Sequence, residues 1–166
     1  MVDFHTASHW VTHLSGSWAA ERHVVSRRCA EGTTAVESNR GTSSHQHNPF
    51  LVLSEGGAPA EDHGRCFAFC LVYSGNFRAA VDVTESGRAR VNVGVNPMTF
   101  SWCLEPGHAF ESPECVLAVS DAGMGPLSAT LHAIMRERLL PPQWRHHVCP
   151  VLINTWEAMY FDVAHA

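Results

Sequence analysis

Lysine is missing from this chain of 166 residues: all 11 basic residues are arginine, against 16 acidic residues, and the net charge is -5. Chemistry that needs a lysine, such as Schiff-base formation, a P-loop or a Ser-Lys dyad, is therefore excluded. The acidic balance argues against nucleic acid as a partner, because nucleic-acid binders show a basic patch or stripe. Charged residues make up only 16%, below the usual share of roughly 25%, so we expect part of the surface to be buried against something else.

Long apolar runs are also lacking. No stretch approaches the ~18 apolar residues of a membrane span, so no membrane partner is expected. The first residues, Met1 to His5, have neither the basic nor the apolar region of a signal peptide. This favours a cytoplasmic location, unless residues that precede Met1 are missing.

The six cysteines form no CxxC pair, which argues against zinc-ribbon and thioredoxin-like proteins. Cys66 and Cys70 fall in a strand-like run, where four residues span about 13 Å, too far for a mutual disulfide. We interpret the cysteines as mostly reduced, small core residues. With 45% hydrophobic residues, the chain can form one packed domain.

The middle of the chain has the pattern of β-structure. Residues 66–73 form an apolar run typical of a buried strand. Apolar and polar residues then alternate over 77–83 and again over 89–95, on both sides of the turn Glu85-Ser86-Gly87. This pattern predicts an antiparallel hairpin with one buried face.

The flanking segments are less clear. Residues 10–14 and 18–25 could be short strands or one helical turn, and residues 40–49 have turn composition throughout. Two further strands are predicted at 99–104 and 115–120. The first segment, to about Leu53, is too polar to interpret further.

The pattern changes to helical near the end. Pro126 suits the first turn of a helix whose apolar residues share one face, and Pro141-Pro142 ends it. The apolar run 151–153 then predicts a buried strand, which normally needs neighbours on both sides. Because the chain stops at Ala166, soon after this run, we expect it to be truncated.

Five stretches, in the same order and at the same spacing, resemble the glycoside hydrolase family 36 α-galactosidases and together cover residues 14 to 163. They are Glu37–Phe50 (ESNRGTSSHQHNPF), Leu71–Phe77 (LVYSGNF), Gly94–Trp102 (GVNPMTFSW), Leu104–Gly107 (LEPG) and Pro150–Asp162 (PVLINTWEAMYFD). One such motif would be weak, but five in register are specific.

The resemblance implies a mainly β fold. Family members have an N-terminal β-supersandwich, a (β/α)8 barrel and a C-terminal β-domain. We therefore expect a partial supersandwich over 1–125, a linker helix and loop over 126–149, and over 150–166 the first strand of a truncated barrel. The family's matched segment begins upstream of Met1, so the sandwich is expected to be incomplete.

The resemblance also implies the chemistry. The family hydrolyses terminal α-D-galactosyl residues, as in melibiose and raffinose, with retention through two aspartates. Both would lie beyond Ala166, so we expect no catalytic residue, no cofactor and no activity in this chain alone. Trp156 matches a tryptophan at the end of the first barrel strand that lines the galactose pocket. Full-length members bind α-galactosides and commonly form dimers or tetramers.

Other interpretations stay open. A non-catalytic β-sandwich could bind carbohydrate or a partner chain, with Trp18, Trp102, Trp144 and Trp156 as candidates. Less favoured is a cupin-like metalloenzyme using the His45-Gln46-His47 pattern. The cupin pattern needs a Glu three or four residues after the second His, whereas Glu55 follows His47 by eight. No metal site is therefore expected.

Several conspicuous residues are expected to be structural. Glu157 is expected to make an ion pair, because alternation along a strand turns it away from Trp156. Glu61 and Asp62, with Glu55 nearby, lie at a Gly/Pro-rich loop and are expected to be solvated. Arg40-Gly41 is expected to brace a long loop, since glycine allows positive φ and arginine has five donors.

Overall fold

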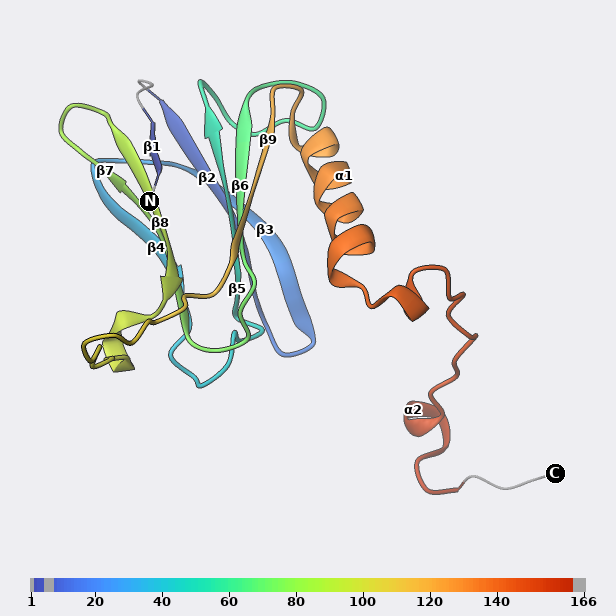
Figure 1. The fold of residues 1–166 in the computed structure, drawn as a ribbon. Helices are drawn as coiled ribbons and strands as arrows, with labels where there is room; N and C mark the ends of the chain where they lie inside the picture. The colour runs from blue at the N-terminus through green and yellow to red at the C-terminus, as the bar shows by residue number, and fades with distance from the viewer. Residues whose placement is uncertain (1, 5–7, 163–166) are drawn as a thin grey trace. The chain divides into compact units, whose positions relative to one another are not determined.

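A computed structural model describes residues 2–4 and 8–162. The chain divides into two compact units, Met1–His132 and Ala133–Ala166, and each is described by itself. The first unit contains two facing antiparallel sheets and most of one helix (Figure 1). The second contains short helical turns joined by irregular chain.

The two sheets account for all the strands of the described residues. The five-stranded sheet has the order β3 (Ala20–Arg28), β2 (His9–Ser17), β5 (His47–Glu55), β6 (Cys66–Leu71) and β9 (Cys115–Ser120). The four-stranded sheet has the order β1 (Val2–Phe4), β8 (Ala89–Val95), β7 (Phe77–Val83) and β4 (Gly32–Glu37). The expected mainly β fold is confirmed.

The hydrophobic core lies between the two sheets. On β7, Phe77, Ala79 and Val81 are buried in this core, whereas Arg78 and Asp82 on the other face are partly exposed; Ala80 of that face is also buried. The register pairs Phe77 with Val95 and Val83 with Ala89. The predicted hairpin is therefore confirmed, because its alternation matches a sheet with one face against a core.

A second apolar cluster joins the five-stranded sheet to the helix α1 (Met124–Ile134). Leu127 and Leu131 of α1 pack with Val52, Ala68 and Ala118. The predicted helix is confirmed with a start two residues earlier, and Pro126 lies in its first turn. A π-helical segment, η2 (Met135–Leu139), continues it. Among the described residues, no helix is long and apolar enough to cross a membrane.

The polar N-terminal segment contains more strand than its composition predicts. Residues 10–14 belong to β2, and of the range 18–25 residues 20–25 belong to β3, while the sequence pattern predicts neither β4 nor β5. The prediction of turn structure over 40–49 is wrong for its last three residues, because β5 already begins at His47. Pro49 is tolerated there because the β2–β5 ladder is irregular at this point, where no backbone donor is needed.

Two predicted strands are wrong. Residues 99–104 hold the end of a 3-10 turn, η1 (Pro97–Thr99), and then irregular chain. Residues 151–153 have no regular structure either, and Val151 is fully exposed. Both segments have strand-like composition, but no described strand pairs with them, and an unpaired strand has no ladder to hold it. The first barrel strand is therefore not formed here.

The cysteines are free thiols, but only some lie in the core. Cys66 is buried, and Cys29 and Cys70 are half-buried. Burial, with a smaller contribution from Cys115, raises the pKa of the Cys70 thiol to about 11. Cys103, Cys115 and Cys149 are exposed, so the expectation of small core residues is wrong for these three.

A tight turn before α1 gives a stability prediction. Gly123 has φ 87°, and a Cβ added there would lie 2.7 Å from both the Ala60 carbonyl oxygen and the His63 amide nitrogen. Gly123→Ala is therefore expected to lower the free energy of unfolding in urea by about 1–3 kcal/mol. Gly57→Ala is the control, because its added Cβ would meet no atom within 4 Å; equal effects of the two would contradict this account.

Candidate functional site

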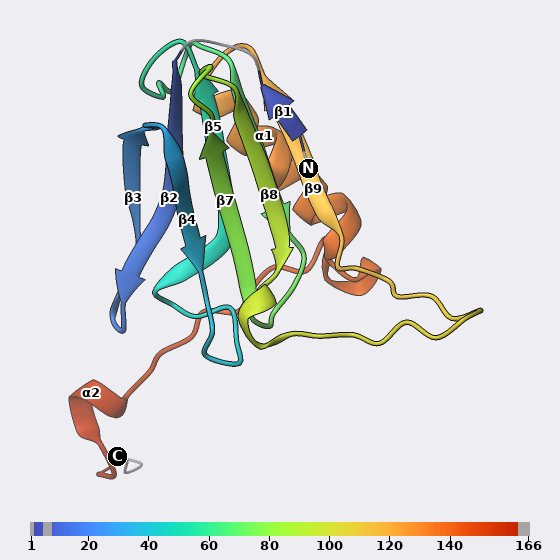
Figure 2. The ribbon, with the colours of Figure 1, turned by 90° about the vertical axis from the view of Figure 1, so that its left-hand side faces the viewer.

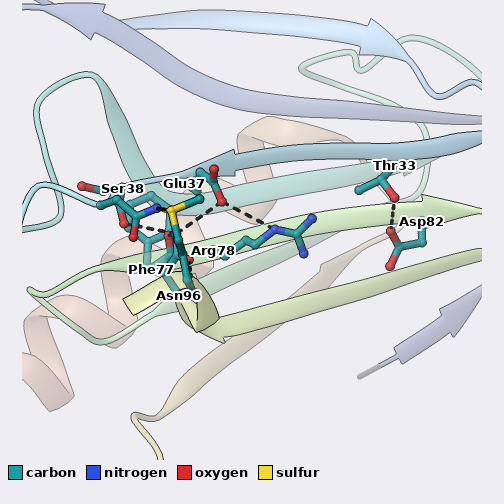
Figure 3. A network of polar contacts seen from close by, with 9 residues as sticks. Thr33, Glu37, Ser38, Phe77, Arg78, Asp82 and Asn96 are labelled. Atoms are coloured by element: carbon teal, nitrogen blue, oxygen red, sulfur yellow. Dashed lines mark hydrogen bonds and ion pairs between the residues drawn. The ribbon is translucent and has the colours of Figure 1, made fainter. Parts of the chain in front are cut away.

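Three of the recognised sequence stretches meet at one end of the sandwich, around the buried side chain of Asn96. This residue is only 1% exposed. Its Nδ2 donates to the carbonyl oxygens of Ser38 and Phe77 and to Oε2 of Glu37, each at 3.3 Å (Figure 3). Its Oδ1 accepts from the amide of Met98 at 3.0 Å. One amide thus joins the ends of β4, β7 and β8.

A second asparagine holds the loop 38–46. Asn76 Oδ1 accepts from the amide of Gly41 at 2.6 Å, and its Nδ2 donates to Thr99 Oγ1 at 3.4 Å. Ser43 Oγ donates to the carbonyl oxygens of Tyr73 and Gly75 at 2.8 and 3.0 Å. Because these amides and this hydroxyl are bonded within the chain, the cluster has the chemistry of a scaffold.

The outer face of the four-stranded sheet next to this cluster carries charged side chains. Arg78 Nε lies 3.6 Å from Glu37 Oε2. Asp82 accepts from Thr33 Oγ1 at 2.6 Å and from Asn92 Nδ2 at 2.8 Å. Both carboxylates already have partners, and such partly exposed contacts contribute little to stability.

The structure agrees with the role expected for Gly41 but not with the role expected for Arg40. Gly41 has φ 85°, as expected for a position that needs glycine. Arg40 is exposed, and only its backbone amide makes a hydrogen bond, to Ser38 Oγ at 3.4 Å. Among the described residues its guanidinium has no partner, so the expected bracing comes from Asn76 and Asn96 instead.

The His45-Gln46-His47 pattern does not gather further ligands. His45 is exposed in the loop, while His47 is half-buried at the start of β5. The described residues contain no group of three or more His, Cys, Asp or Glu side chains placed to hold a metal ion. His47 instead packs edge-on against His13 of β2, with ring centroids 5.8 Å apart.

Of the carboxylates of the 55–65 region, Glu61 and Asp62 lie in solvent as expected, whereas the side chain of Glu55 is only 15% exposed. Glu61 and Asp62 are exposed, and Asp62 accepts from His63 Nδ1 at 2.7 Å. Arg65 lies 3.9 Å from Glu55 and 3.0 Å from Asp121. Among the described residues, no nucleophile–base arrangement emerges from these pairs.

Trp156 lies at the start of the short helix α2 (Trp156–Met159), in the second unit. Its ring packs edge-on against Tyr160 and Phe161, with centroids 5.3 and 5.0 Å away, and the side chain is 45% exposed. The expected position at the end of a strand is not formed. The side chain of Glu157 lies outside the described part of the chain.

An exposed aromatic cluster surrounds Trp102, the one member of the cluster that the sequence analysis named as a candidate. Phe110 packs between Phe100 and Trp102, with centroids 5.5 and 5.2 Å away, and Trp102 is 60% exposed. Figure 2 shows this segment as a long loop that leaves η1 and returns to β9. The sequence feature that could have indicated this cluster is the alternation of apolar residues at 98, 100, 102 and 104, in the segment where a strand is predicted.

The other candidate tryptophans have surroundings of their own. Trp18 lies at the β2–β3 turn and is 82% exposed. Trp144 belongs to the 3-10 turn η3 (Pro142–Trp144) and packs against His147. Trp102 is therefore the tryptophan named from the sequence that belongs to the aromatic cluster of the long loop.

Comparison with known proteins gives a consistent result. The family model described as glycosyl hydrolase family 36 N-terminal domain matches residues 1–105, and that described as melibiase matches residues 109–166. The α-galactosidase AgaA of Geobacillus stearothermophilus is 46% identical over 161 residues, which cover 97% of this chain and 22% of AgaA. A probable α-galactosidase G of Aspergillus terreus is 40% identical over 90% of this chain and 21% of its own length.

Solved structures agree in fold. The crystal structure of AgaA matches with a TM-score of 0.91 at 45% identity, over 97% of this chain and 22% of that chain. Variants of AgaA have been solved in complex with raffinose and with stachyose. The chain spans about a fifth of the length of these relatives. Since the N-terminal domain model alone matches residues 1–105, the chain belongs to glycosyl hydrolase family 36.

Proposed function

We propose that the chain is the N-terminal part of a retaining α-galactosidase that acts on terminal α-D-galactosyl residues of oligosaccharides of the melibiose and raffinose type. The observation that carries this proposal is the 46% identity to AgaA over 97% of the chain. The AgaA complexes with raffinose and stachyose support the substrate class. In this account the sandwich is a scaffold, and the reaction takes place on a barrel outside these 166 residues.

The proposal includes a division of the chain. Residues 1–125 form the partial supersandwich, 126–149 a linker helix and loop, and 150–166 the start of the catalytic barrel. Retaining hydrolysis needs two carboxylates, one as nucleophile and one as acid and base. We assign neither to this chain. The reaction requires no cofactor, because both steps are acid–base and nucleophilic chemistry of carboxyl groups.

Trp156 is the substrate-binding residue of this proposal. An indole ring offers a large apolar face for the C–H groups of a galactose ring. Its ring now packs on Tyr160 and Phe161, so it has to turn toward the sugar when the barrel is complete. Assembly of the full-length protein into a homo-oligomer is likewise part of the proposal.

A chimera tests the proposal. The segment of AgaA that aligns with this chain is replaced by residues 1–166, and raffinose hydrolysis is measured. Activity within about tenfold of AgaA is expected, because an equivalent scaffold leaves the transition-state contacts in place. In the chimera, Trp156→Ala is expected to raise KM more than Trp144→Ala, its control. A folded chimera without activity, or equal KM values in the two variants, would contradict the proposal.

The exposed aromatic cluster favours one alternative function, a carbohydrate-binding module. Phe100, Trp102 and Phe110 present ring surface to solvent on one loop, and such rings are suited to sugar C–H faces. This alternative predicts weak sugar binding without turnover, whereas the scaffold proposal predicts neither for the isolated chain.

A further inference from the structure

Two histidines face each other inside the first unit, next to the start of β5. His13 is 2% exposed and lies on β2 opposite Leu51 of β5, a core residue between the sheets. His47 lies opposite Ser15, two positions further along the same interior face. The Nδ1 atoms of both imidazoles are buried and have no hydrogen-bond partner among the described residues.

Arg27 sets the protonation state of His13. Its Nη2 lies 2.9 Å from Nε2 of His13. A guanidinium can only donate, so Nε2 must accept through a lone pair. His13 is therefore neutral and carries its proton on Nδ1, the buried atom without a partner. A second proton on this ring would remove the bond to Arg27 and place two positive charges side by side.

Most of the surroundings of His13 oppose its protonation. Burial is the main cause that lowers the pKa of His13, the Leu14 backbone opposes it in part, and the charges of Arg27 and His47 add to it. On the same face, His23 lies opposite Ser15 on β3, and His9 lies four residues earlier on β2.

The other sheet supplies no compensating charge. Its strands β4 and β7 contact β5. The interior positions of these strands hold Thr34 and Val36 on β4 and Phe77, Ala79 and Val81 on β7. None of these side chains is titratable. Among the described residues, no carboxylate acts on His13.

The histidine pair lies where the loop 38–46 ends. His47 is the first residue of β5, directly after the loop 38–46, and the amide of Gly16 donates to the carbonyl of Gln46 at 3.0 Å. The β2–β5 register shifts between His13 and Ser15, so the ladder is already irregular there. Packing of the two imidazoles therefore adds to the backbone contacts that hold this junction.

We propose that His13, packed against His47, forms an acid-sensitive latch that anchors the loop 38–46 and the start of β5 while the His13 ring is neutral. Above a pH of about 6.5 His13 is neutral in the folded and the unfolded chain, and the latch is closed. As the pH falls below that value the unfolded chain takes up a proton at His13 that the folded chain cannot, so stability falls. Local opening at the junction lets the His13 imidazole reach water and take up that proton.

The latch is tested first on the unaltered 166-residue chain. Long-range ¹H–¹⁵N NMR of the imidazoles is expected to show His13 neutral, with its proton on Nδ1, at pH 7. Between pH 7 and pH 5, the amide protection factors of residues 46–51 are expected to fall about tenfold more than those of the β7–β8 hairpin. Protonation of His13 at pH 6.5 or above, or equal loss of protection in both regions, would overturn the proposal.

A variant pair separates the latch from general acid sensitivity. His13→Gln keeps an oxygen to accept from Arg27 but cannot titrate, whereas His108→Gln removes an exposed histidine of the long loop. The unfolding equilibrium constant of His13→Gln is expected to change about tenfold less than that of His108→Gln between pH 7.5 and pH 5. An unchanged pH dependence overturns the proposal, and if His13→Gln fails to fold, the NMR result decides.

Discussion

The isolated 166-residue chain is expected to release no galactose from raffinose. Retaining hydrolysis needs two carboxyl groups only about 5–5.5 Å apart on the two sides of the glycosidic bond. The carboxylates described here are used differently: Asp82 is bonded to Thr33 and Asn92, and Asp62 lies in solvent beside His63. Because glycosidases owe rate enhancements on the order of 10⁶-fold or more to such groups, the expected loss is complete.

The assay compares this chain with AgaA at equal concentration, using p-nitrophenyl α-galactoside and raffinose. A raffinose titration followed by tryptophan fluorescence runs beside it, with sucrose as the control sugar. No turnover and no binding is the result that the scaffold proposal predicts. Saturable binding without turnover would favour the carbohydrate-binding alternative and direct attention to Trp102. Turnover that scales with the concentration of this chain would contradict the proposal.

Asn96→Ala is expected to lower the free energy of unfolding by about 3 kcal/mol or more. The substitution leaves the buried Ser38 carbonyl oxygen and the Met98 amide without their partner, and each such unsatisfied group costs about 1–3 kcal/mol. The Phe77 carbonyl oxygen loses one of its two donors and keeps the Ser38 amide. Asn92→Ala is the matched control, because Asn92 makes one partly buried bond to Asp82. Its expected effect is about 1 kcal/mol.

The measurement is urea denaturation of both variants, together with amide exchange in the loop 38–46. For Asn96→Ala the loop is expected to lose protection, because its first residue is held by that side chain. Equal effects of Asn92→Ala and Asn96→Ala on stability would show that the network around Asn96 is not what joins β4, β7 and β8.

Much of the fold was predictable where side-chain periodicity and local turns coincide. The β7–β8 hairpin was predicted because alternation on both strands surrounds a short turn. The strand β4 was missed because its polar residues hide the alternation, and β5 because its apolar run Leu51–Leu53 is buried on both faces and does not alternate. The reverse error arose at 99–104, where alternating apolar residues belong to an exposed loop that no strand pairs with.

The candidate site was less predictable, because its contacts are distant in the sequence. Asn96 bonds groups that are 59, 58 and 19 residues away, and nothing local distinguishes it from the turn residue that Asn96-Pro97 suggests. His13 likewise meets His47 only across the β2–β5 ladder. The family resemblance located the right segments, but the roles of single side chains within them required the structure.

The chimera with AgaA tests the central claim most directly, through kcat/KM for raffinose. If residues 1–166 are the N-terminal scaffold of an α-galactosidase, the chimera retains kcat/KM within about tenfold of AgaA, a difference of about 1.4 kcal/mol in transition-state stabilisation. A chimera that is folded and has the oligomeric state of AgaA, yet hydrolyses raffinose no faster than buffer, would contradict the claim.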